Sequence, residues 1–380
     1  MRIGITTSVV QRGKTGVAQY LFALLRALVA HSGPHEFVLF VLEEDVQLFA
    51  FARDKLQLVR VSERVRPAVK NILWHQTELP KLARQHQLDV LHVPSYRRLL
   101  WPRPCPLVAT IHDLAPFHLA DKYDWKRMFY GRVVARWLAR RQDEIIAISE
   151  NTARDLTRFF GVGRERITVI HNGLEHDRFF PAPPEQARAE VANRYGLLRP
   201  FFLYVARLEH PAKNHVPLIS AFEEFKAATR SDWQLAFGGS DWHGAEAIHA
   251  AIKRSPYGGE IRCLGFVPDA QLPDLYRAAE VFVYPSLYEG FGMPPAEAMA
   301  CGCPVISSTC GSLGEVVGDA AAIVEPRDIH SIAKQLRTLA TEPAARERFR
   351  AAGLAQAKKF DWRKTAAETV KVYERAGMRG

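Results

Sequence analysis

The chain has 380 residues, of which 48% are hydrophobic and 24% are charged, so it has the composition of a globular protein and a length that predicts two domains. No apolar run approaches the roughly 18 residues that span a bilayer, and the polar amino terminus is too short for a signal peptide. Five cysteines, an odd number, argue against a secreted disulfide framework. We therefore expect a cytoplasmic protein, with Cys301 and Cys303 as small buried thiols rather than zinc ligands.

The positive charge is concentrated in the first half of the sequence. The net charge is +10, and residues 1–180 hold 27 Lys and Arg against 18 Asp and Glu, a net +9. Residues 181–380 hold 24 against 23, a net +1. This imbalance predicts an anionic partner for the first half alone. A basic nucleic-acid-binding protein is one reading, and it requires base-stacking aromatic residues among the basic ones.

Strand and helix patterns alternate through the first half. We expect strands in 2–10, 36–42, 55–61, 106–111, 144–149 and 167–170, a buried helix in 17–30, a helix and then a strand in 72–95, and a helix in 150–160. The strand 106–111 stops at His112 and Asp113. Polar groups at the carboxyl end of a parallel strand lie where doubly wound sheets bind ligands.

Residues 124–143 predict a basic amphipathic helix. Arginines and lysines from Lys126 to Arg141 alternate with apolar residues such as Val133 and Trp137 at helical spacing. Such a helix can lie on a membrane surface or meet an anionic acceptor. It can equally be an ordinary packed helix with a solvated basic face, and the sequence leaves both readings open.

The second half continues the alternation. PAPPEQ, residues 181–186, is rich in proline and predicts the linker. A strand ends at Arg207, Lys213 and Asn214 precede a helix, strands follow at 235–240 and 261–266, and the chain ends in a helix. The pattern predicts an α/β protein of two doubly wound domains, 1–178 and 179–361, with a terminal helix in 362–380.

The stretch 281–310 carries the most chemical information. It predicts a buried strand, a glycine-rich loop, a short helix opened by Pro294 and Pro295, and a second strand. Backbone N–H groups at the start of a helix favour anions. Glu289 and Glu297 would repel a bare phosphate, but they suit a ligand that also carries hydroxyl groups, such as a nucleotide sugar. Alternatively, Glu297 only suits the helix dipole and Glu289 is a loop charge.

The sequence from Glu289 to Glu297, EGFGMPPAE, resembles the E-x7-E signature of the retaining glycosyltransferases of family 4, which have the GT-B fold. The resemblance implies two Rossmann-like domains with an interdomain cleft and a terminal helix that crosses back to the first domain. It also implies that the first acid contacts the donor sugar and the second the ribose. The loop residues between them would contact the donor: Gly290, Phe291, Gly292 and Met293.

Other positions carry the same resemblance. Gly16, at the start of the first helix, matches a glycine that faces the donor phosphates, and His112 matches a histidine close to the reacting centre. Arg207 and Lys213 match the cations that bind the donor diphosphate, and backbone groups near Val267 match those that hold the base. The family's usual proline before Asn172 is His171 here, a change that we expect to affect only the local turn.

The resemblance implies transfer of a hexose, such as mannose or glucose, from a UDP- or GDP-linked sugar to an acceptor hydroxyl with retention. No D-x-D motif is present, so we expect protein cations rather than a metal ion to neutralise the leaving group, and no cofactor. The expected acceptor is an anionic lipid-linked or free saccharide at the inner face of the membrane, with peripheral contact through the first domain. A GT-B epimerase or phosphorylase is a further reading; nucleic acid is not expected.

Overall fold

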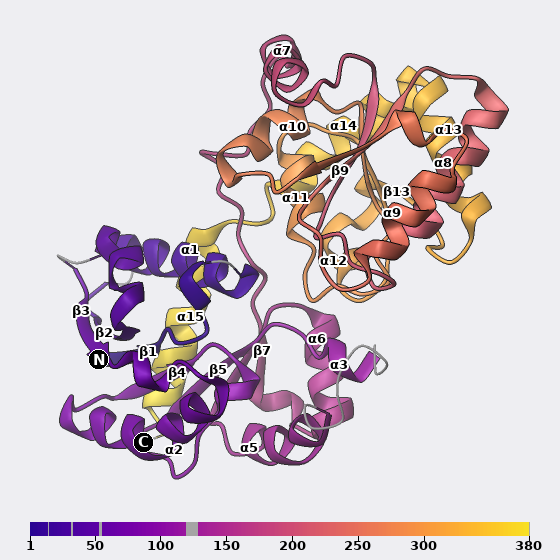
Figure 1. Ribbon diagram of the computed structural model, residues 1–380. Coiled ribbons are helices and arrows are strands. Elements are labelled where there is room, and N and C mark those ends of the chain that lie inside the picture. Colours follow the sequence, from indigo (N-terminus) through magenta and orange to yellow (C-terminus); the bar gives the residue numbers. More distant parts are fainter. Residues whose placement is uncertain (14, 32, 53–54, 119–127, 380) are drawn as a thin grey trace. The chain divides into compact units, whose positions relative to one another are not determined.

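The computed structural model in Figure 1 describes every residue except 14, 32, 53–54, 119–127 and 380. The chain divides into two compact units, one formed by Met1–Gly173 with Asp361–Gly380 and the other by Leu174–Phe360. The sequence placed this boundary at residue 178. Each unit is an α/β structure built on one parallel sheet, as the alternating pattern predicted.

The first unit contains a seven-stranded parallel sheet in the order β3-β2-β1-β4-β5-β6-β7. Its strands are β1 (Arg2–Thr6), β2 (Glu36–Leu42), β3 (Gln57–Val61), β4 (Val90–Val93), β5 (Leu107–Ile111), β6 (Glu144–Ala147) and β7 (Ile167–Val169). Its α-helices are α1 (Gly16–His31), α2 (Ala68–Gln85), α3 (Ala115–His118), α5 (Arg136–Ala139), α6 (Glu150–Asp155) and α15 (Trp362–Gly377).

The central strands of this sheet are buried on both faces, which explains their continuous apolar sequences. β5 is buried along its whole length, and β2 is buried at every position after Glu36. Helix α1 buries most of its residues, as its nearly uniform apolar sequence predicted. The strand order reverses at β1, which has β2 on one side and β4 on the other. Loops at the carboxyl ends of these strands therefore surround a topological switch point.

Helix α15 belongs to the first unit although it is the last element of the chain. In Figure 1 its yellow ribbon lies among the indigo and purple elements. Tyr373 on α15 bonds through its hydroxyl to His92 Nδ1 at 2.8 Å, and His92 Nε2 bonds to Thr110 Oγ1 at 2.8 Å. Burial lowers the pKa of His92 to about 3, so the ring is neutral and joins α15 to β4 and β5 without a charge.

The second unit contains a six-stranded parallel sheet in the order β10-β9-β8-β11-β12-β13. Its strands are β8 (Phe201–Val205), β9 (Gln234–Gly238), β10 (Ile261–Gly265), β11 (Val281–Tyr284), β12 (Val305–Ser307) and β13 (Ala321–Ile323). Its helices are α7 (Pro184–Tyr195), α8 (His215–Thr229), α9 (Ala245–Arg254), α10 (Leu272–Ala278), α11 (Met293–Ala300), α12 (Leu313–Val317), α13 (Ile329–Thr341) and α14 (Pro343–Ala357).

Two local predictions need correction. The expected linker 181–186 is partly wrong, because α7 begins at Pro184, where a proline fits the first helical position. The expected basic helix is described from residue 128, contains a π-helical turn at Tyr130–Ala135 and ends at Ala139. Lys126 and Arg127 lie outside the described residues.

Cys301 and Cys303 are buried free thiols, as predicted. Within the described ranges, no helix is long and apolar enough to cross a bilayer.

Candidate functional site

The predicted donor residues of the second unit follow the carboxyl ends of its parallel strands. Arg207 and Lys213 follow β8, Val267 follows β10, and Glu289 follows β11. Strands β8 and β11 are neighbours in the sheet, so their loops emerge at the same edge. The sequence separates Lys213 from Glu289 by 76 positions, and the parallel sheet brings the two side chains into contact.

Lys213 and Glu289 form the central ion pair of this edge. The Lys213 Nζ atom lies 2.6 Å from Glu289 Oε1, and the two side chains are 17% and 14% exposed. Tyr284, the last residue of β11, donates its hydroxyl to the same oxygen at 2.9 Å. The Tyr204 hydroxyl donates to the Lys213 carbonyl at 2.6 Å and so fixes the lysine backbone. Two buried tyrosines thus hold the pair in place.

The loop before α11 has a conformation that requires glycine. Gly292 precedes the helix with a φ of +110°, and a Cβ atom there would lie 2.6 Å from Leu313 Cδ2. Gly311 has a φ of +66°, and a Cβ atom there would lie 2.4 Å from the Glu289 carbonyl oxygen. The Ser312 hydroxyl donates to the carbonyls of Glu289 and Phe291 at 3.0 and 2.8 Å. A second loop therefore braces the loop that carries Glu289.

The two prolines of α11 limit its backbone donors. Met293 begins the helix, and Pro294 and Pro295 follow as its second and third residues, where they have no N–H to offer. The sequence argument placed the anion-binding amides at the start of this helix. In the structure those amides can come from the loop residues and from Met293, but not from the two residues after it. The prolines still define where the helix begins, as predicted.

Glu297 projects from α11 into a buried, polar environment. Its Oε2 atom accepts a hydrogen bond from the Tyr276 hydroxyl at 2.9 Å. Burial raises the pKa of Glu297 to about 7, while the bond from Tyr276 and the charge of Arg178 act in the opposite direction. Its carboxyl group therefore changes charge close to neutral pH.

Arg207 contacts Trp242 and Glu209. Its guanidinium stacks over the Trp242 ring with 4.6 Å to the centroid, and its Nη2 lies 3.6 Å from Glu209 Oε2. The side chain is 54% exposed. The structure thus places the two predicted phosphate cations in different settings, a half-buried paired lysine and an exposed arginine that rests on an aromatic ring.

Val267 follows β10 and is buried, with 7% of its surface exposed. The residue before it, Phe266, is 72% exposed. The sequence argument named Val267 and passed over Phe266, although an aromatic residue directly after a strand can be read from the sequence.

In the first unit, Gly16 begins α1, and a Cβ atom there would meet no described atom within 4 Å. Its φ is not in the left-handed region, so neither packing nor backbone geometry requires glycine. His112 follows β5, and its buried Nε2 has no hydrogen-bond partner among the described residues. Burial lowers the pKa of His112 to about 4, against a hydrogen bond to the Pro94 carbonyl. The imidazole is therefore neutral at physiological pH.

The sequence argument missed the residues that position the predicted ones. Tyr276 and Tyr284 hold the two glutamates, and Gly311 and Ser312 hold the loop backbone. Of these four residues, only Tyr284 could have been found from the sequence, because it is a polar residue at the carboxyl end of a strand. The carboxyl ends of the parallel strands form the edge of the sheet where such folds bind ligands, called the ligand edge below. Within the described part of the chain, no cluster of three or more His, Cys, Asp or Glu side chains could hold a metal ion.

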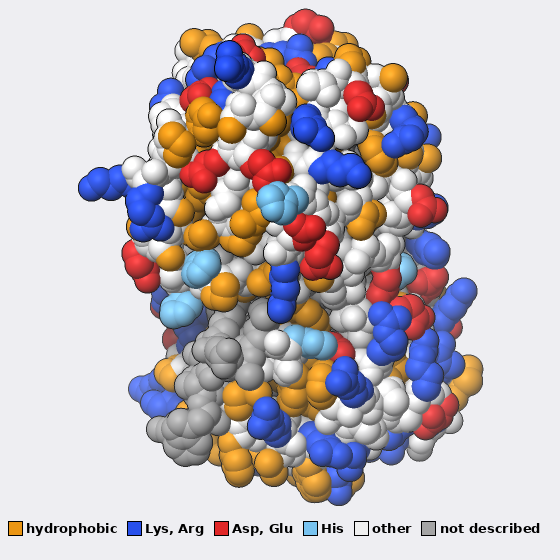
Figure 2. Space-filling model, turned by 90° about the vertical axis from the view of Figure 1, so that its right-hand side faces the viewer, with side chains coloured by type: hydrophobic (Ala, Val, Ile, Leu, Met, Phe, Trp, Pro, Cys, Tyr) orange, Lys and Arg blue, Asp and Glu red, His pale blue; other side chains and the backbone are white. Residues whose placement is uncertain are grey.

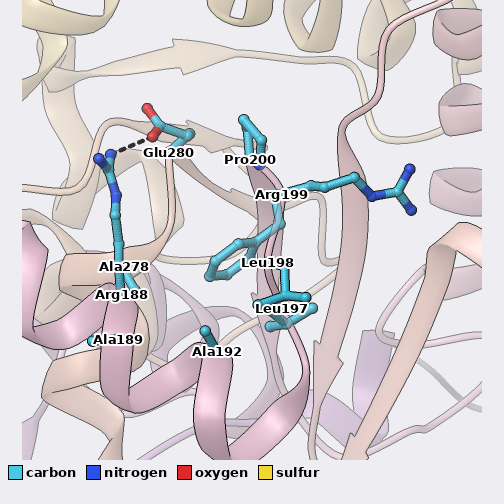
Figure 3. A pocket seen from close by; sticks show the side chains of 10 residues that line it. Arg188, Ala189, Ala192, Leu197, Leu198, Arg199, Pro200, Ala278 and Glu280 are labelled. Atoms are coloured by element: carbon cyan, nitrogen blue, oxygen red, sulfur yellow. Dashed lines mark hydrogen bonds and ion pairs between the residues drawn. The ribbon is translucent and has the colours of Figure 1, made fainter.

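A hollow of about 380 Å³ lies at the other edge of the second sheet, beside the amino end of β8. Figure 3 shows Arg188 reaching Glu280 across it, while Arg199 extends to the other side. Arg199 has its own partner, Glu260, at 3.2 Å. Both arginines are neutralised, and the hollow contains none of the predicted donor residues.

Two family models match this chain, one after the other. Residues 14–178 match the family described as Glycosyltransferase Family 4, and residues 192–356 match Glycosyl transferases group 1. O-antigen chain mannosyltransferase B of Escherichia coli is 33% identical over 268 residues, which are 70% of this chain and 70% of that protein. Serotype-specific mannosyltransferase WbdA of Escherichia coli is 29% identical over 72% of this chain, which spans only 34% of WbdA.

A solved structure gives the same fold. Anabaena Alr3699/HepE in complex with UDP and glucose has a TM-score of 0.77 and 19% identity, over 99% of this chain and 100% of that one. At this identity the likeness concerns the fold alone. The two family matches and the Escherichia coli mannosyltransferase together identify the chain: it belongs to glycosyltransferase family 4 and has the GT-B fold.

Proposed function

We propose that the protein transfers a hexose from a nucleoside diphosphate sugar to an acceptor hydroxyl with retention of the anomeric configuration. The observation that carries the proposal is the Lys213–Glu289 pair, which presents a cation and a carboxylate side by side at the ligand edge of the second sheet. A diphosphate needs the cation, and sugar hydroxyls need the carboxylate. Glu297, eight positions further on, offers a second acceptor for the ribose hydroxyls.

The cations act on the leaving group. Departure of the nucleoside diphosphate concentrates negative charge on its β-phosphate, and Lys213 and Arg207 would offset that charge without a metal ion. The chain has no D-x-D motif to hold one. We assign no enzymic nucleophile; in the proposed front-face route the leaving phosphate accepts the proton of the acceptor hydroxyl. No further cofactor is needed for this route.

Contacts to the rest of the donor follow from the same reading. The neutral His112 offers its buried Nε2 to the donor sugar, and Gly16 leaves room for the donor phosphates to approach the start of α1. Within the second unit, the backbone of the loop 290–293 and of Val267 would contact the donor, with the base beside Val267.

The names of two relatives support one choice of transferred sugar. The two Escherichia coli proteins are named as mannosyltransferases, one of them acting on the O-antigen chain. We therefore propose mannose ahead of glucose as the transferred sugar, a GDP- or UDP-linked donor, and a saccharide or lipid-linked saccharide acceptor in polysaccharide or glycolipid assembly.

A thermal-shift panel of GDP-mannose, UDP-glucose and ADP-glucose tests the donor assignment. A ligand at 100 times its Kd stabilises the folded state by about 2.7 kcal/mol, so a true donor raises the melting temperature and the others do not. We expect the response to shrink in Glu297→Gln and to persist in Glu185→Gln, which changes an exposed glutamate of α7. Equal responses in the two variants would remove Glu297 from the donor site.

A second proposal concerns the surface of the first unit. Phe129, Val133 and Trp137 are 58%, 51% and 45% exposed and are spaced by four residues, so they share one helix face. Arginines are exposed between them, at Arg132, Arg136 and Arg140. The lower part of the face in Figure 2 shows hydrophobic side chains lying among Lys and Arg side chains.

Trp101 extends this surface. It is 42% exposed, its ring meets the Trp137 ring edge-on at 6.4 Å, and the Arg141 guanidinium lies 3.6 Å from the Trp137 centroid. Exposed tryptophans beside arginines are typical of surfaces that rest on anionic bilayers. We propose that this surface, formed by Trp101 and residues 129–141, makes peripheral contact with a membrane that carries the acceptor.

A further inference from the structure

Arg98 is a half-buried cation that has no acidic partner among the residues that the structure describes. It ends the 3₁₀ helix Tyr96–Arg98, which follows β4. Its Nε donates to Asn71 Oδ1 and its Nη1 donates to the Arg97 carbonyl at 3.1 Å, and no carboxylate among the described residues pairs with it. Burial lowers the pKa of Arg98, which means that its charge is held at a cost.

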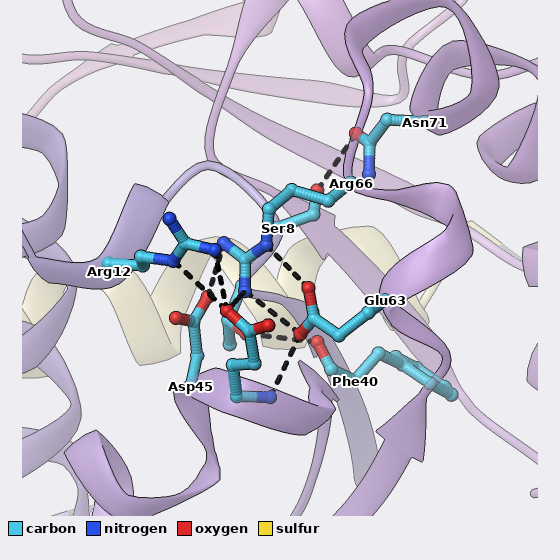
Figure 4. Close-up of polar contacts among 9 residues, drawn as sticks. Ser8, Arg12, Phe40, Asp45, Glu63, Arg66 and Asn71 are labelled. Carbon is cyan, nitrogen blue, oxygen red and sulfur yellow. Dashed lines mark hydrogen bonds and ion pairs between the residues drawn. The ribbon is translucent and has the colours of Figure 1, made fainter.

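A neighbouring arginine shows the usual solution. Arg66 lies 2.5 Å from Glu63 and 3.2 Å from Asp45, so its charge is balanced within the protein (Figure 4). Arg12, on the loop after β1, is paired with Glu44 at 2.7 Å. Arg98 therefore differs from both of these arginines.

Asn71, on α2, supplies a second unpartnered donor beside Arg98. Its Oδ1 accepts from Ser8 Oγ at 3.1 Å, the bond drawn in Figure 4, and from Arg98 Nε. Because a guanidinium can only donate, the amide orientation is fixed and Nδ2 is the donor. Asn71 is 1% exposed, and its Nδ2 has no partner among the described residues. An unmet donor so deeply buried is uncommon.

The three side chains lie at the ligand edge of the first sheet. Ser8 comes two residues after the end of β1, and Arg98 comes five residues after the end of β4, on the two sides of the point where the strand order reverses. The Pro94 carbonyl, bonded to His112, is four residues from Arg98. A chain of four residues spans at most about 14 Å, which limits the separation between Arg98 and the residue that His112 contacts.

We propose that Arg98 and Asn71 bind a phosphate group of the acceptor, with Ser8 holding the Asn71 amide in place. The inference rests on the proposed function, because it identifies the acceptor as a phosphate ester. The cluster offers a guanidinium and an amide N–H from two separate segments, and both groups donate to phosphate oxygens. Ser8 donates its hydroxyl to Asn71 Oδ1 and so holds the amide in place. The phosphate would supply the negative charge that the described part of the chain does not place beside Arg98.

Calorimetric titration with inorganic pyrophosphate tests the site without any sugar transfer. The titrations use the full chain carrying Arg207→Gln and Lys213→Met, which removes the proposed donor cations. Pyrophosphate should still bind, and adding Arg98→Gln should weaken it by about tenfold or more, as expected for a charge-assisted hydrogen bond. Adding Arg84→Gln, at an exposed position of α2, should change nothing. A change of less than about twofold with Arg98→Gln, or no binding before it is added, overturns the proposal.

A second variant, Asn71→Asp, distinguishes loss of the binding site from a folding defect in Arg98→Gln. It keeps the side-chain shape and gives Arg98 the missing carboxylate, so pyrophosphate binding should be lost while the melting temperature is maintained or raised. Retained binding in a folded Asn71→Asp variant would contradict the proposal. A purely structural Arg98 predicts that retained binding.

Two further titrants identify the source of the phosphate. A short-chain isoprenyl diphosphate that binds more tightly than pyrophosphate indicates a lipid-linked acceptor, and the reverse order indicates a soluble phosphate ester. Glucuronate, bound as tightly as either, would overturn the choice of phosphate. Donor binding is measured separately on the wild-type chain, so failure of the proposed function appears there and not in these titrations.

Discussion

The cations at the ligand edges of the two sheets differ in whether a carboxylate lies beside them. In the second unit, Lys213 is paired with Glu289, and Arg207 rests on Trp242 beside Glu209. In the first unit, Arg98 has no carboxylate among the described residues. The second edge mixes both charges, which suits a ligand with phosphates and hydroxyls. Among the described residues, the first edge leaves the charge of Arg98 without a carboxylate, which suits an anion. The sequence shows a related contrast between its two halves, since residues 1–180 carry a net +9 and residues 181–380 a net +1.

Replacing Glu289, the carboxylate at the ligand edge of the second sheet, should have the largest effect on turnover. Glu289→Gln leaves Lys213 without its partner and removes a charged acceptor for the donor sugar. We expect turnover to fall about 100-fold or more, the scale seen when one preorganised polar group is lost from a reacting centre. Initial rates at saturating donor measure this, and Glu185→Gln is the matched control. A loss of less than about threefold would show that the pairing is structural.

Replacing Lys213 or Arg207 should lower turnover less than replacing Glu289 does. Lys213→Met and Arg207→Gln should each lower kcat by about 10- to 100-fold and change donor affinity less, because the leaving-group charge is greatest in the transition state. Activity should survive EDTA. Loss of activity in EDTA with recovery in Mn²⁺ would refute the metal-independent route.

The charge of Glu297 makes donor binding to the second unit depend on pH. Its carboxylate form accepts from the ribose hydroxyls, and with a pKa of about 7 it is lost as the pH falls. We expect donor affinity to fall by about tenfold between pH 8 and pH 6, the value of one charged hydrogen bond. Calorimetry at several pH values measures this, and Glu297→Gln should give weak binding at every pH. An unchanged pH profile in that variant would contradict the assignment.

The same carboxyl group affects stability in the opposite sense. Its pKa is raised from 4.5 to about 7 in the folded chain. Its contribution to stability is therefore fully present below pH 4.5 and is lost as the pH rises through 7, a loss of up to about 3 kcal/mol. Glu297→Gln should raise the free energy of unfolding at pH 8 relative to wild type and leave it nearly unchanged at pH 4. Urea unfolding at the two pH values tests the sign.

The smallest effect concerns the surface of Trp101 and residues 129–141. Each Arg near anionic lipid contributes about 1 kcal/mol, and salt weakens the attraction. The protein should sediment with anionic vesicles at low salt and less at physiological salt. Reversing Arg132, Arg136 and Arg140 to Glu should abolish this and leave donor binding intact. If wild type stays in the supernatant at every lipid composition, the helix is an ordinary solvated face.

Local sequence patterns predicted the elements because they depend on local chemistry. The buried parallel strands and the helix opened by Pro294 and Pro295 could be read directly from the residues. The π-helical turn at Tyr130–Ala135 could not, because periodicity near 3.6 does not reveal a single widened turn.

The contacts between distant segments were beyond the sequence. The E-x7-E spacing named Glu289 and Glu297, but their partners Lys213 and Tyr276 are 76 and 21 positions away. The unpaired state of Arg98 depends on which side chains the fold does not bring near it. A sequence lists charges, and only the three-dimensional arrangement shows which of them are neutralised.

The central claim is that Glu297 of the second unit binds the nucleotide donor and that Arg98 of the first unit binds an acceptor phosphate. Calorimetry of Glu297→Gln and Arg98→Gln, each titrated with the nucleotide sugar and with a short-chain isoprenyl diphosphate, tests it most directly. The account predicts that Glu297→Gln loses affinity for the nucleotide sugar alone and that Arg98→Gln loses affinity for the isoprenyl diphosphate alone. If either variant binds both ligands more weakly to the same extent, or binds both as tightly as wild type, the roles assigned to Glu297 and Arg98 are wrong.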